Sequence, residues 1–340
     1  MRPYEVPGPM PQIAVLAAGG HTGRLAVGAL QRRGAKVRAL TRKDCDARDR
    51  AAVRRAIEGT DGVVNLAGPF LMNGVAPVLA ARDAGIPYVD TTGEQAFMMD
   101  VRRAIHEGPP VVNALAYEYA YGDLAAKLHF PDGGRELDVF YRNRGTQPSA
   151  GTRKSILRVM GAPTLSYEEG KLAHVQAAQW IRTFDTADGP RTGMSFAGGE
   201  VLTVPKHTPF RTVRTYIAAS PATAKRSKLL APVARAALRG PILRLAERIA
   251  DARHVPPSNE KARGEVHLVG DGRQVSVTMS DPYVATAEIA AEGILRLVGR
   301  TTGGVLAPAE AFDPADMLAA LAKSVPGLVV EDFTRSRPKE

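Results

Sequence analysis

The chain has 340 residues, of which 44% are hydrophobic and 24% charged, and this composition excludes a disordered or fibrous protein. Its longest apolar stretches, Gly62–Pro69 and Val75–Ala81, are far shorter than the roughly 20 residues that a membrane-spanning helix requires. The formal net charge of +10 would attract polyanions, but the arginines are scattered instead of forming one block with aromatic residues, so nucleic acid is not an expected partner.

The first third of the chain alternates short apolar strands with helices. Residue spacing predicts strands at Gln12–Leu16, Lys36–Leu40, Gly62–Ala67, Tyr88–Thr91 and Pro110–Ala114. It predicts the intervening helices at Thr22–Arg33, Arg48–Glu58, Val75–Ala84 and Gln95–Glu107. Strands separated by helical stretches of about 10 to 15 residues are typical of a parallel sheet that is covered on both faces. We therefore expect an α/β fold that begins with a Rossmann-type domain.

Beyond about Asp123 the pattern changes to strands of alternating polarity. These predicted strands are Leu137–Arg142, Leu172–Ala177, Arg211–Ala218, Gly264–Val269 and Gln274–Met279. Asp188-Gly189 and Asp271-Gly272 mark tight turns, so a mainly antiparallel sheet is expected. Helices are predicted near the end of the chain, at Ala285–Val298 and Pro314–Lys323.

A glycine-rich turn joins the first predicted strand to the first helix, in the sequence Ala17-Ala18-Gly19-Gly20-His21-Thr22-Gly23-Arg24. A dinucleotide fingerprint belongs at this place, because free amides at a helix start attract pyrophosphate. Gly20 lets the backbone approach the phosphates, and Gly23 permits close packing of helix on strand. Ala17 stands where the fingerprint has its first glycine. The expected cofactor contacts here are Ala17, Gly19, Gly20, His21, Thr22 and Gly23, and the alternative is a purely structural turn.

The end of the second strand distinguishes the two nicotinamide dinucleotides. An acidic residue at this place binds the ribose hydroxyls of NAD, but here the sequence is Leu40-Thr41-Arg42-Lys43 and the first carboxylate is Asp44. Two cations suit a ribose phosphate, so Thr41, Arg42 and Lys43 predict NADP(H). The alternative is a pair of solvated surface cations.

Several segments, in order along the chain, resemble the saccharopine dehydrogenase-like oxidoreductases, including the trans-acting enoyl reductases of lipid and polyketide assembly. The resemblance is carried by "AAGGHTGR", the stretch Val63–Glu94, "PSAGTRKS" from Pro148, "GGE" from Gly198, "DPYVATA" from Asp281 and "GVLAPAEAF" from Gly304. It implies a Rossmann domain over residues 1–124, an α+β domain over 125–282 for substrate or dimerisation, and C-terminal helices over 283–340 that pack back on the first domain.

The resemblance also implies further cofactor contacts after the third and fourth strands. Ala67, Gly68, Pro69 and Phe70 would lie beside the ribose and nicotinamide, and Gly93 and Glu94 would border the nicotinamide. A structural turn at Gly68-Pro69, and capping of the next helix by Glu94, are the alternatives. Many relatives have a glycine-phenylalanine pair and a proline where this chain has the three tyrosines of residues 116–123.

Nicotinamide itself carries the hydride, so the protein must position the substrate and, where needed, supply a proton and stabilise charge. No catalytic tetrad is recognisable in the sequence. The candidate proton donors are Tyr117, Tyr121, Lys154 and His207, chosen for their chemistry and their nearness to the resembling segments. Tyrosines packed between domains are the alternative, as is a structural His207, which has no second ligand at metal-binding spacing. No metal site is expected.

Two functions from different classes remain open. One is an NADP(H)-dependent reductase of a C=C or C=N bond in a lipid, polyketide or amino-acid-derived metabolite, with a small, hydrophobic or carrier-bound substrate. The other is a dinucleotide-binding sensor or scaffold without turnover. The single cysteine and the absence of a secretory-type apolar core in Met1–Pro11 favour the cytoplasm.

The basic stretch Arg226–Arg253 has apolar residues at helical spacing and a break at Gly240-Pro241, which predicts two short helices. Such helices contact a membrane or an acyl carrier in some proteins, but a cover over the substrate pocket or a homodimer surface is the commoner role.

Overall fold

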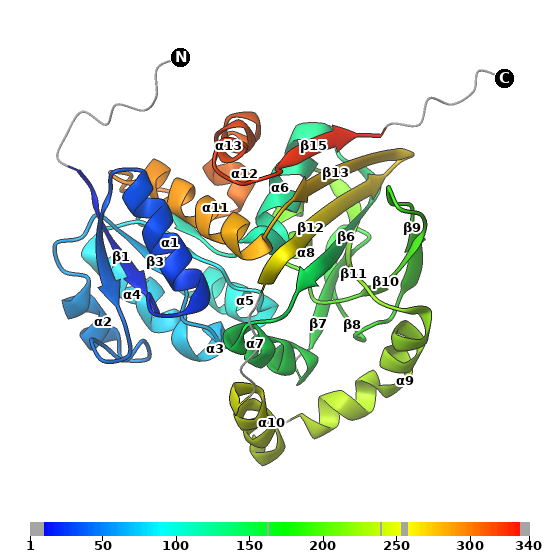
Figure 1. Cartoon of the computed structure of the whole chain (residues 1–340), viewed down its shortest axis with the longest axis horizontal. Helices are drawn as coiled ribbons and strands as arrows, with labels where there is room; N and C mark the ends of the chain where they lie inside the picture. The colour runs from blue at the N-terminus through cyan, green and yellow to red at the C-terminus, as the bar shows by residue number, and fades with distance from the viewer. Residues whose placement is uncertain (1–9, 162, 239, 253–257, 334–340) are drawn as a thin grey trace.

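The computed structural model describes residues 10–161, 163–238, 240–252 and 258–333, and these form two sheets with helices around and between them (Figure 1). The first sheet has the strand order β14-β5-β4-β3-β1-β2, and every neighbouring pair is parallel. Its strands are β1 (Gln12–Leu16), β2 (Lys36–Leu40), β3 (Gly62–Asn65), β4 (Tyr88–Asp90), β5 (Val111–Val112) and β14 (Val305–Leu306).

Alternating side chains of these strands enter two separate layers of helices. Ile13 and Val15 of β1 pack in the core that contains α1 (His21–Arg32) and α11 (Pro282–Leu297). Ala14 and Leu16 point to the other face and its core. The helices of that second face are α2 (Arg50–Ala56), α3 (Phe70–Asn73), α4 (Val75–Ala84) and α5 (Gln95–Ala104). Burial on both faces explains why the strands are apolar throughout.

The second sheet has nine strands and is mainly antiparallel. Its main path is β15-β13-β12-β6-β11-β10-β9, and β7 and β8 extend from β11 as a hairpin. Only the central pair β6 and β11 is parallel among the described strands. The strands are β6 (Gly134–Thr146), β7 (Thr164–Glu168), β8 (Lys171–Val175), β9 (Ile181–Phe184), β10 (Arg191–Ser195), β11 (Phe210–Ala218), β12 (Ser258–Gly270), β13 (Arg273–Met279) and β15 (Val329–Asp332).

One continuous core joins the two sheets. It runs from Val64 and Val112 in the first sheet, through Leu124 of α6 (Tyr117–His129), to Val266 and Val277 in the second. The other helical elements are α7 (Ala150–Gly161), α8 (Glu200–Thr203), η1 (Val204–Lys206), α9 (Pro221–Ala237), α10 (Gly240–Ala252), α12 (Pro308–Ala311) and α13 (Pro314–Leu321). The relative positions of the two sheets are therefore fixed by shared apolar packing.

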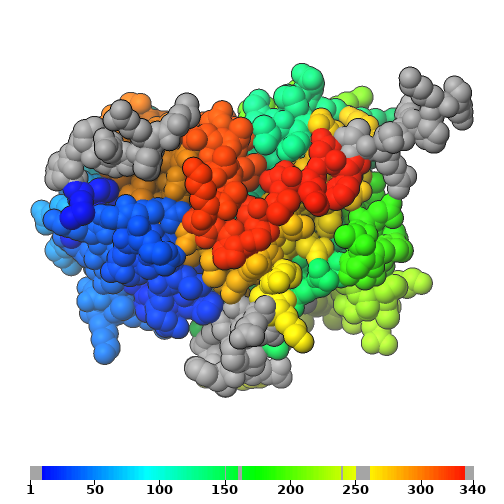
Figure 2. Space-filling view, turned by 45° about the horizontal axis from the view of Figure 1, so that its top comes forward, coloured from blue at the N-terminus to red at the C-terminus, as the bar shows by residue number. Residues whose placement is uncertain are grey.

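The C-terminal segment bridges the two sheets. Figure 2 shows it in orange and red between the blue N-terminal part and the yellow and green second sheet. Arg33, just beyond α1, pairs with Glu288 and Glu292 of α11 at 2.5 and 2.9 Å. Glu288 is only 2% exposed, so this ion pair is better shielded from solvent than a surface pair.

The expected fold class, a Rossmann-type parallel sheet with a second α+β unit, is confirmed. The hairpin at Asp271-Gly272 is also present, with φ of 46° and 79° at its two residues. Strands β7, β9, β10, β14 and β15 were not predicted, and the tyrosine-rich segment expected as a loop begins helix α6. The limits at 124 and 282 stay predictions, and residues 1–9 and 334–340 of the predicted ranges lie outside the described residues.

Candidate functional site

A crevice for a nucleotide is expected where the first sheet reverses its winding. β2 lies on one side of β1 and β3 on the other, so the chain leaves the carboxyl ends of β1 and β3 in opposite directions. In open α/β sheets, ligands bind beyond the strand ends at this switch point. The glycine-rich turn and Gly68-Pro69 follow these two strands.

The start of α1 has no side-chain cap. The N-cap residue is Gly20, which has no side chain that could accept a hydrogen bond from the first amides of the helix. No acidic residue lies in the first turn of α1. A Cβ atom on Gly23 would lie 2.3 Å from the Ala17 carbonyl oxygen, which explains why only glycine fits there. Ala17 itself has φ of 59°, the left-handed conformation that glycine adopts more readily. The turn is therefore shaped for an anion at the positive end of α1.

His21 closes one side of this turn. Its Nε2 atom is buried and has no hydrogen-bond partner among the described residues. The imidazole packs edge-on against Tyr283 at the start of α11, with ring centroids 5.0 Å apart. Burial lowers the pKa of His21, which favours the neutral ring. The Tyr283 hydroxyl accepts a hydrogen bond from the Ser149 amide at 2.8 Å, so segments from three distant parts of the sequence meet here.

The residues after β2 are arranged to leave two cations available. The Asp44 carboxylate accepts hydrogen bonds from the Thr41 amide and hydroxyl, both at 2.7 Å, and these bonds lower the pKa of Asp44. Arg42 and Lys43 are exposed, and neither forms an ion pair with a residue of the described ranges. The first carboxylate after β2 is thus occupied by its own turn, whereas the guanidinium and ammonium groups are not.

Glu94 connects three elements beyond the carboxyl ends of β3 and β4. Its carboxylate accepts from the Phe70 amide at 2.8 Å, the Leu71 amide at 3.1 Å and the Ser155 hydroxyl at 2.9 Å. The sequence-based alternative, that Glu94 caps the next helix, is wrong, because the side chain makes no cap bond to α5. Glu94 instead caps α3, the helix that directly follows Gly68-Pro69, whose peptide bond is cis. Its bond to Ser155 also connects α7 to the first sheet.

Asp90 ends β4 and is fully buried. It accepts from the Thr92 and Ala114 amides at 3.0 Å each and from the Asn113 side chain at 2.7 Å. Burial raises the pKa of Asp90 from 3.8 to about 6 despite these bonds. The folded state then binds the proton more tightly than the unfolded state, so the stabilising contribution is present below pH 3.8 and is lost as pH rises to about 6.

Replacing Asp90 by asparagine is expected to remove this loss. The new Oδ1 keeps both amide bonds, and the Asn113 amide can turn to accept from the new NH₂. In urea unfolding, the free energy of unfolding of the variant should increase relative to that of the wild type as pH rises from 3.8 to about 6. Asp132→Asn, at an exposed position, serves as the control and should leave the pH profile unchanged. Parallel profiles for Asp90→Asn and the wild type would contradict the assignment.

The start of α6, a few residues after β5, has strained backbone. Tyr119 has φ of 82° and ψ of −52°, an unfavourable conformation for a residue with a side chain. Its hydroxyl donates to the Gly93 and Ala197 carbonyls at 3.2 and 3.3 Å, which fixes the ring against the loop after β4. Gly199 belongs to the same packing, because its Cβ would lie 2.8 Å from that ring.

Glu118 precedes this strained residue. Its side chain is neither fully buried nor exposed, and it forms no ion pair with, and accepts no hydrogen bond from, another residue in the described part of the chain. Burial raises the pKa of the Glu118 carboxyl. A carboxyl group with a raised pKa at the carboxyl end of a parallel strand is suited to proton transfer.

Two of the four proton donors chosen from the sequence have hydroxyls that are already hydrogen-bonded. Tyr117 and Tyr121 are fully buried, and their hydroxyls donate to the Glu265 and Ala285 carbonyls at 3.0 and 3.3 Å. Burial raises both hydroxyl pKa values. These two tyrosines therefore pack between the domains, which was the alternative left open.

His207 has partners within the described part of the chain, whereas the role of Lys154 stays a prediction. His207 is buried, with Nε2 2.9 Å from Asp123 and Nδ1 2.9 Å from the Thr208 hydroxyl. No group of three potential metal ligands occurs among the described residues. Lys154 lies on α7 beside Ser155, and it has an interaction partner of its own. Sequence reasoning named the segment around Glu118 but not Glu118 itself. The missed signal is an acidic residue soon after the fifth parallel strand.

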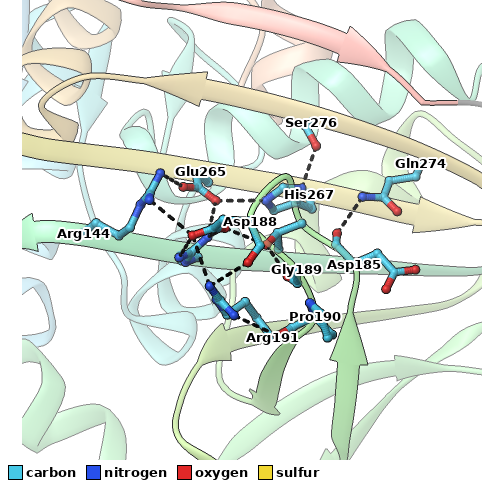
Figure 3. A network of polar contacts seen from close by, with 12 residues as sticks. Arg144, Asp185, Asp188, Gly189, Pro190, Arg191, Glu265, His267, Gln274 and Ser276 are labelled. Atoms are coloured by element: carbon cyan, nitrogen blue, oxygen red, sulfur yellow. Dashed lines mark hydrogen bonds and ion pairs between the residues drawn. The ribbon is translucent and has the colours of Figure 1, made fainter.

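A second polar cluster lies on the second sheet, lining a pocket of about 450 Å³ (Figure 3). Ser276 Oγ is 2.6 Å from His267 Nδ1, and His267 Nε2 is 3.3 Å from Glu265. The series Ser276–His267–Glu265 resembles a catalytic triad. However, Ser276 is only 3% exposed and lies within β13, which is hydrogen-bonded to a neighbouring strand on each side. The backbone amides near Ser276 belong to a sheet and not to a turn that could form an oxyanion hole. We therefore assign Ser276 no hydrolytic role.

Ion pairs hold this cluster in place. Asp188, in the turn between β9 and β10, accepts from Arg142 at 2.5 and 2.8 Å and from Arg191 at 3.1 Å. Arg144 bonds Glu265 at 2.8 Å. The Arg142 guanidinium lowers the pKa of Asp188 strongly. These contacts hold the turn against the sheet. The polar cluster therefore has a structural role.

No protein-family model matches the chain, and neither does any curated protein. Among solved structures, apo saccharopine dehydrogenase (L-Glu forming) from Saccharomyces cerevisiae matches with a TM-score of 0.55 at 12% identity, over 95% of this chain and 99% of that one. The fold that the sequence segments indicated is thus confirmed across both sheets.

Two shorter matches concern about a quarter of the chain. A short-chain dehydrogenase/reductase superfamily protein from Agrobacterium tumefaciens with bound NAD has a TM-score of 0.22 at 24% identity, over 24% of this chain and 32% of that one. A GDP-L-fucose synthetase from Naegleria fowleri bound to NADP has a TM-score of 0.21 at 20% identity, over 24% and 33%. Likenesses this weak carry no argument about the site.

Proposed function

We propose that the chain is an NADP(H)-dependent oxidoreductase that reduces a C=C or C=N bond of a lipid, polyketide or amino-acid-derived metabolite. The observation that carries the proposal is the uncapped start of α1 at the switch point, together with Arg42 and Lys43 beyond the neighbouring strand. The fold shared with a dehydrogenase supports it.

The residues of the crevice fit a dinucleotide. Gly20 and Gly23 leave the helix start accessible, and the orphaned Nε2 of His21 offers a polar atom that has no protein partner within the described ranges. Arg42 is the group best suited to a ribose phosphate, because guanidinium forms paired, charge-assisted hydrogen bonds. Gly68-Pro69 and Gly93 border the space beyond β3 and β4, where the resemblance places the nicotinamide.

The proposed roles follow from what each residue contacts. Nicotinamide, when bound, supplies or accepts the hydride. Glu94 holds the amides of Phe70 and Leu71, so the loop beyond β3 keeps one position. Glu118 carries a proton on its carboxyl oxygen and delivers it to the substrate atom that becomes electron-rich when its neighbouring carbon is reduced. In the reverse direction the same carboxylate takes that proton.

Replacing Arg42 by alanine tests the choice of cofactor. Losing a charge-assisted pair with phosphate is expected to weaken NADPH binding by about 10- to 100-fold, while NADH, which lacks that phosphate, should lose little. Isothermal titration of both cofactors measures the two affinities. Arg48→Ala, which removes an exposed arginine paired with Asp46, is the matched control. Equal loss for both cofactors would remove the argument for NADP(H).

Turnover is tested by mixing NADPH and protein with a panel of enones and imines and following the near-ultraviolet absorbance of the reduced nicotinamide. Oxidation that depends on both the protein and the substrate supports the reductase. Tight NADPH binding without oxidation across the panel would instead support the sensor or scaffold. Absence of binding of both NADP⁺ and NADPH would overturn both readings.

A further inference from the structure

Helices α9 and α10 carry an unusual set of exposed apolar side chains. Apart from Met10, every large hydrophobic side chain more than half exposed in the described ranges belongs to these two helices. They are Leu229 (77%), Leu230 (54%), Val233 (63%), Ile242 (56%), Leu245 (59%) and Ile249 (54%). Figure 1 shows α9 and α10 along the lower edge of the molecule, below the second sheet. Large exposed apolar side chains gathered on two consecutive helices are typical of an interaction site.

The orientation of α9 is opposite to that of an ordinary surface helix. The less exposed positions recur every three or four residues and are occupied mostly by small side chains, Ala224, Ser227, Ala231 and Ala234. The larger Leu229, Leu230 and Val233 lie on the outward side. A helix that stabilised only this chain would bury its large apolar residues. These exposures concern the outward face, so the expectation that this stretch covers the substrate pocket stays a prediction.

α10 has the same organisation with a separate polar stripe. Ile242, Leu245 and Ile249 follow a spacing of three and four residues, so they form one outward stripe, and Arg244 and Arg248 form the next. Glu247 faces inward and pairs with Arg158 of α7 at 2.6 Å. That ion pair anchors α10, so the outward apolar stripe does not arise from a detached helix.

The charge on this surface selects the partner. Six exposed cations accompany the apolar residues, namely Lys225, Arg226, Lys228, Arg235, Arg244 and Arg248. No exposed carboxylate lies on either helix among the residues whose burial is described. A second copy of the same face would bring like charges together, which disfavours self-association. Apolar groups combined with unpaired lysine and arginine are suited to a bilayer that contains anionic lipid.

We propose that α9 and α10 form a docking surface for an anionic membrane. The apolar residues enter the boundary between headgroups and acyl chains, and the cations contact lipid phosphates. No helix in the described ranges is long and apolar enough to cross a bilayer, so the contact is peripheral. The α10 anchor, α7, also donates the Ser155 hydroxyl to Glu94, which places the docking surface one helix away from the crevice.

Co-sedimentation with vesicles tests the proposal on the full chain. The protein should bind vesicles of equal parts phosphatidylglycerol and phosphatidylcholine, and bind phosphatidylcholine alone much more weakly. Leu229→Ser with Leu245→Ser should weaken partitioning by about 10-fold or more, because two apolar side chains no longer enter the bilayer. Lys228→Gln with Arg244→Gln should weaken it by about 10-fold, and added salt should do the same.

The matched control lies on β8, where Lys171 and Leu172 are exposed and belong to neither helix. Lys171→Gln with Leu172→Ser should leave vesicle binding unchanged. Circular dichroism reports whether the helices of each variant remain formed, and NADPH affinity reports whether the part of the chain outside α9 and α10 is folded. Failure to bind anionic vesicles overturns the proposal. It is also overturned if the serine variant binds as well as the wild type, or if that variant converts a dimer to a monomer without any vesicle binding by the wild type.

Discussion

Replacing Glu118 by glutamine is expected to lower kcat by about 100-fold or more, because general acid catalysis commonly contributes 10²- to 10⁴-fold. Glutamine keeps the size of the side chain and removes the transferable proton. Affinity for NADPH should not change, since Glu118 lies beyond β5 and not at the glycine-rich turn. Steady-state kinetics with the best substrate of the panel, together with calorimetric titration of NADPH, separate the two effects.

The pH dependence gives a second readout for Glu118. Burial raises the pKa of this carboxyl, so the proton it donates is retained to higher pH than on an ordinary glutamate. The rate of reduction should fall as pH rises through that raised pKa, and Glu118→Gln should lose this limb of the profile. An unchanged limb in the variant would assign the proton to another group.

A catalytic role and a purely structural role for Glu118 predict opposite effects of Glu118→Gln on the stability of the fold. The raised pKa means that the charged carboxylate is unfavourable in the folded state at neutral pH, so glutamine should stabilise the fold there. A variant with a lower kcat and a higher melting temperature is expected if Glu118 serves activity and destabilises the fold. Glu107→Gln, at an exposed position, is the control and should change neither quantity. Loss of activity together with loss of stability would refute the catalytic role.

Replacing Gly23 by alanine is expected to destabilise the protein by about 1 to 3 kcal/mol or more, because the added methyl group overpacks fixed atoms. Its Cβ would lie 2.3 Å from the Ala17 carbonyl oxygen and 2.7 Å from that of Ala18, and backbone atoms cannot move away cheaply. Displacing the start of α1 also misplaces the amides that face the phosphates. Urea unfolding and NADPH titration should both show the loss.

Gly28 in the same helix is a matched control for this substitution. A Cβ there would approach only the far end of the Arg32 side chain, at 3.2 Å, and that group can move. Gly28→Ala should be neutral or should stabilise α1 by about 0.5 to 1 kcal/mol, because alanine favours the helix. If the two alanine variants were equally stable and bound NADPH equally, Gly23 would not be required for packing α1 on β1.

The sequence predicted the parallel sheet, the position of the glycine-rich turn and the cations after β2. Each of these rests on local physics: strand and helix periodicity, the steric freedom of glycine, and charge placed directly after a strand. The side chain of Asp44 was read as the first carboxylate after the strand, and only the structure shows it bonded to Thr41. These two hydrogen bonds are consistent with the prediction from the local sequence that Asp44 does not bind the ribose.

The roles of the remaining site residues were decided by contacts between distant segments. Glu94 caps α3, 24 residues earlier in the chain, and His207 is paired with Asp123, 84 residues away. Tyr117 and Tyr121 are fully buried with hydrogen-bonded hydroxyls, whereas Glu118 between them is partly exposed, and no local pattern predicts that difference. Helical spacing in α9 and α10 likewise predicts an apolar face but not whether it points inward or outward. Periodicity fixes which residues share a face, whereas the packing of the whole chain determines what each face meets.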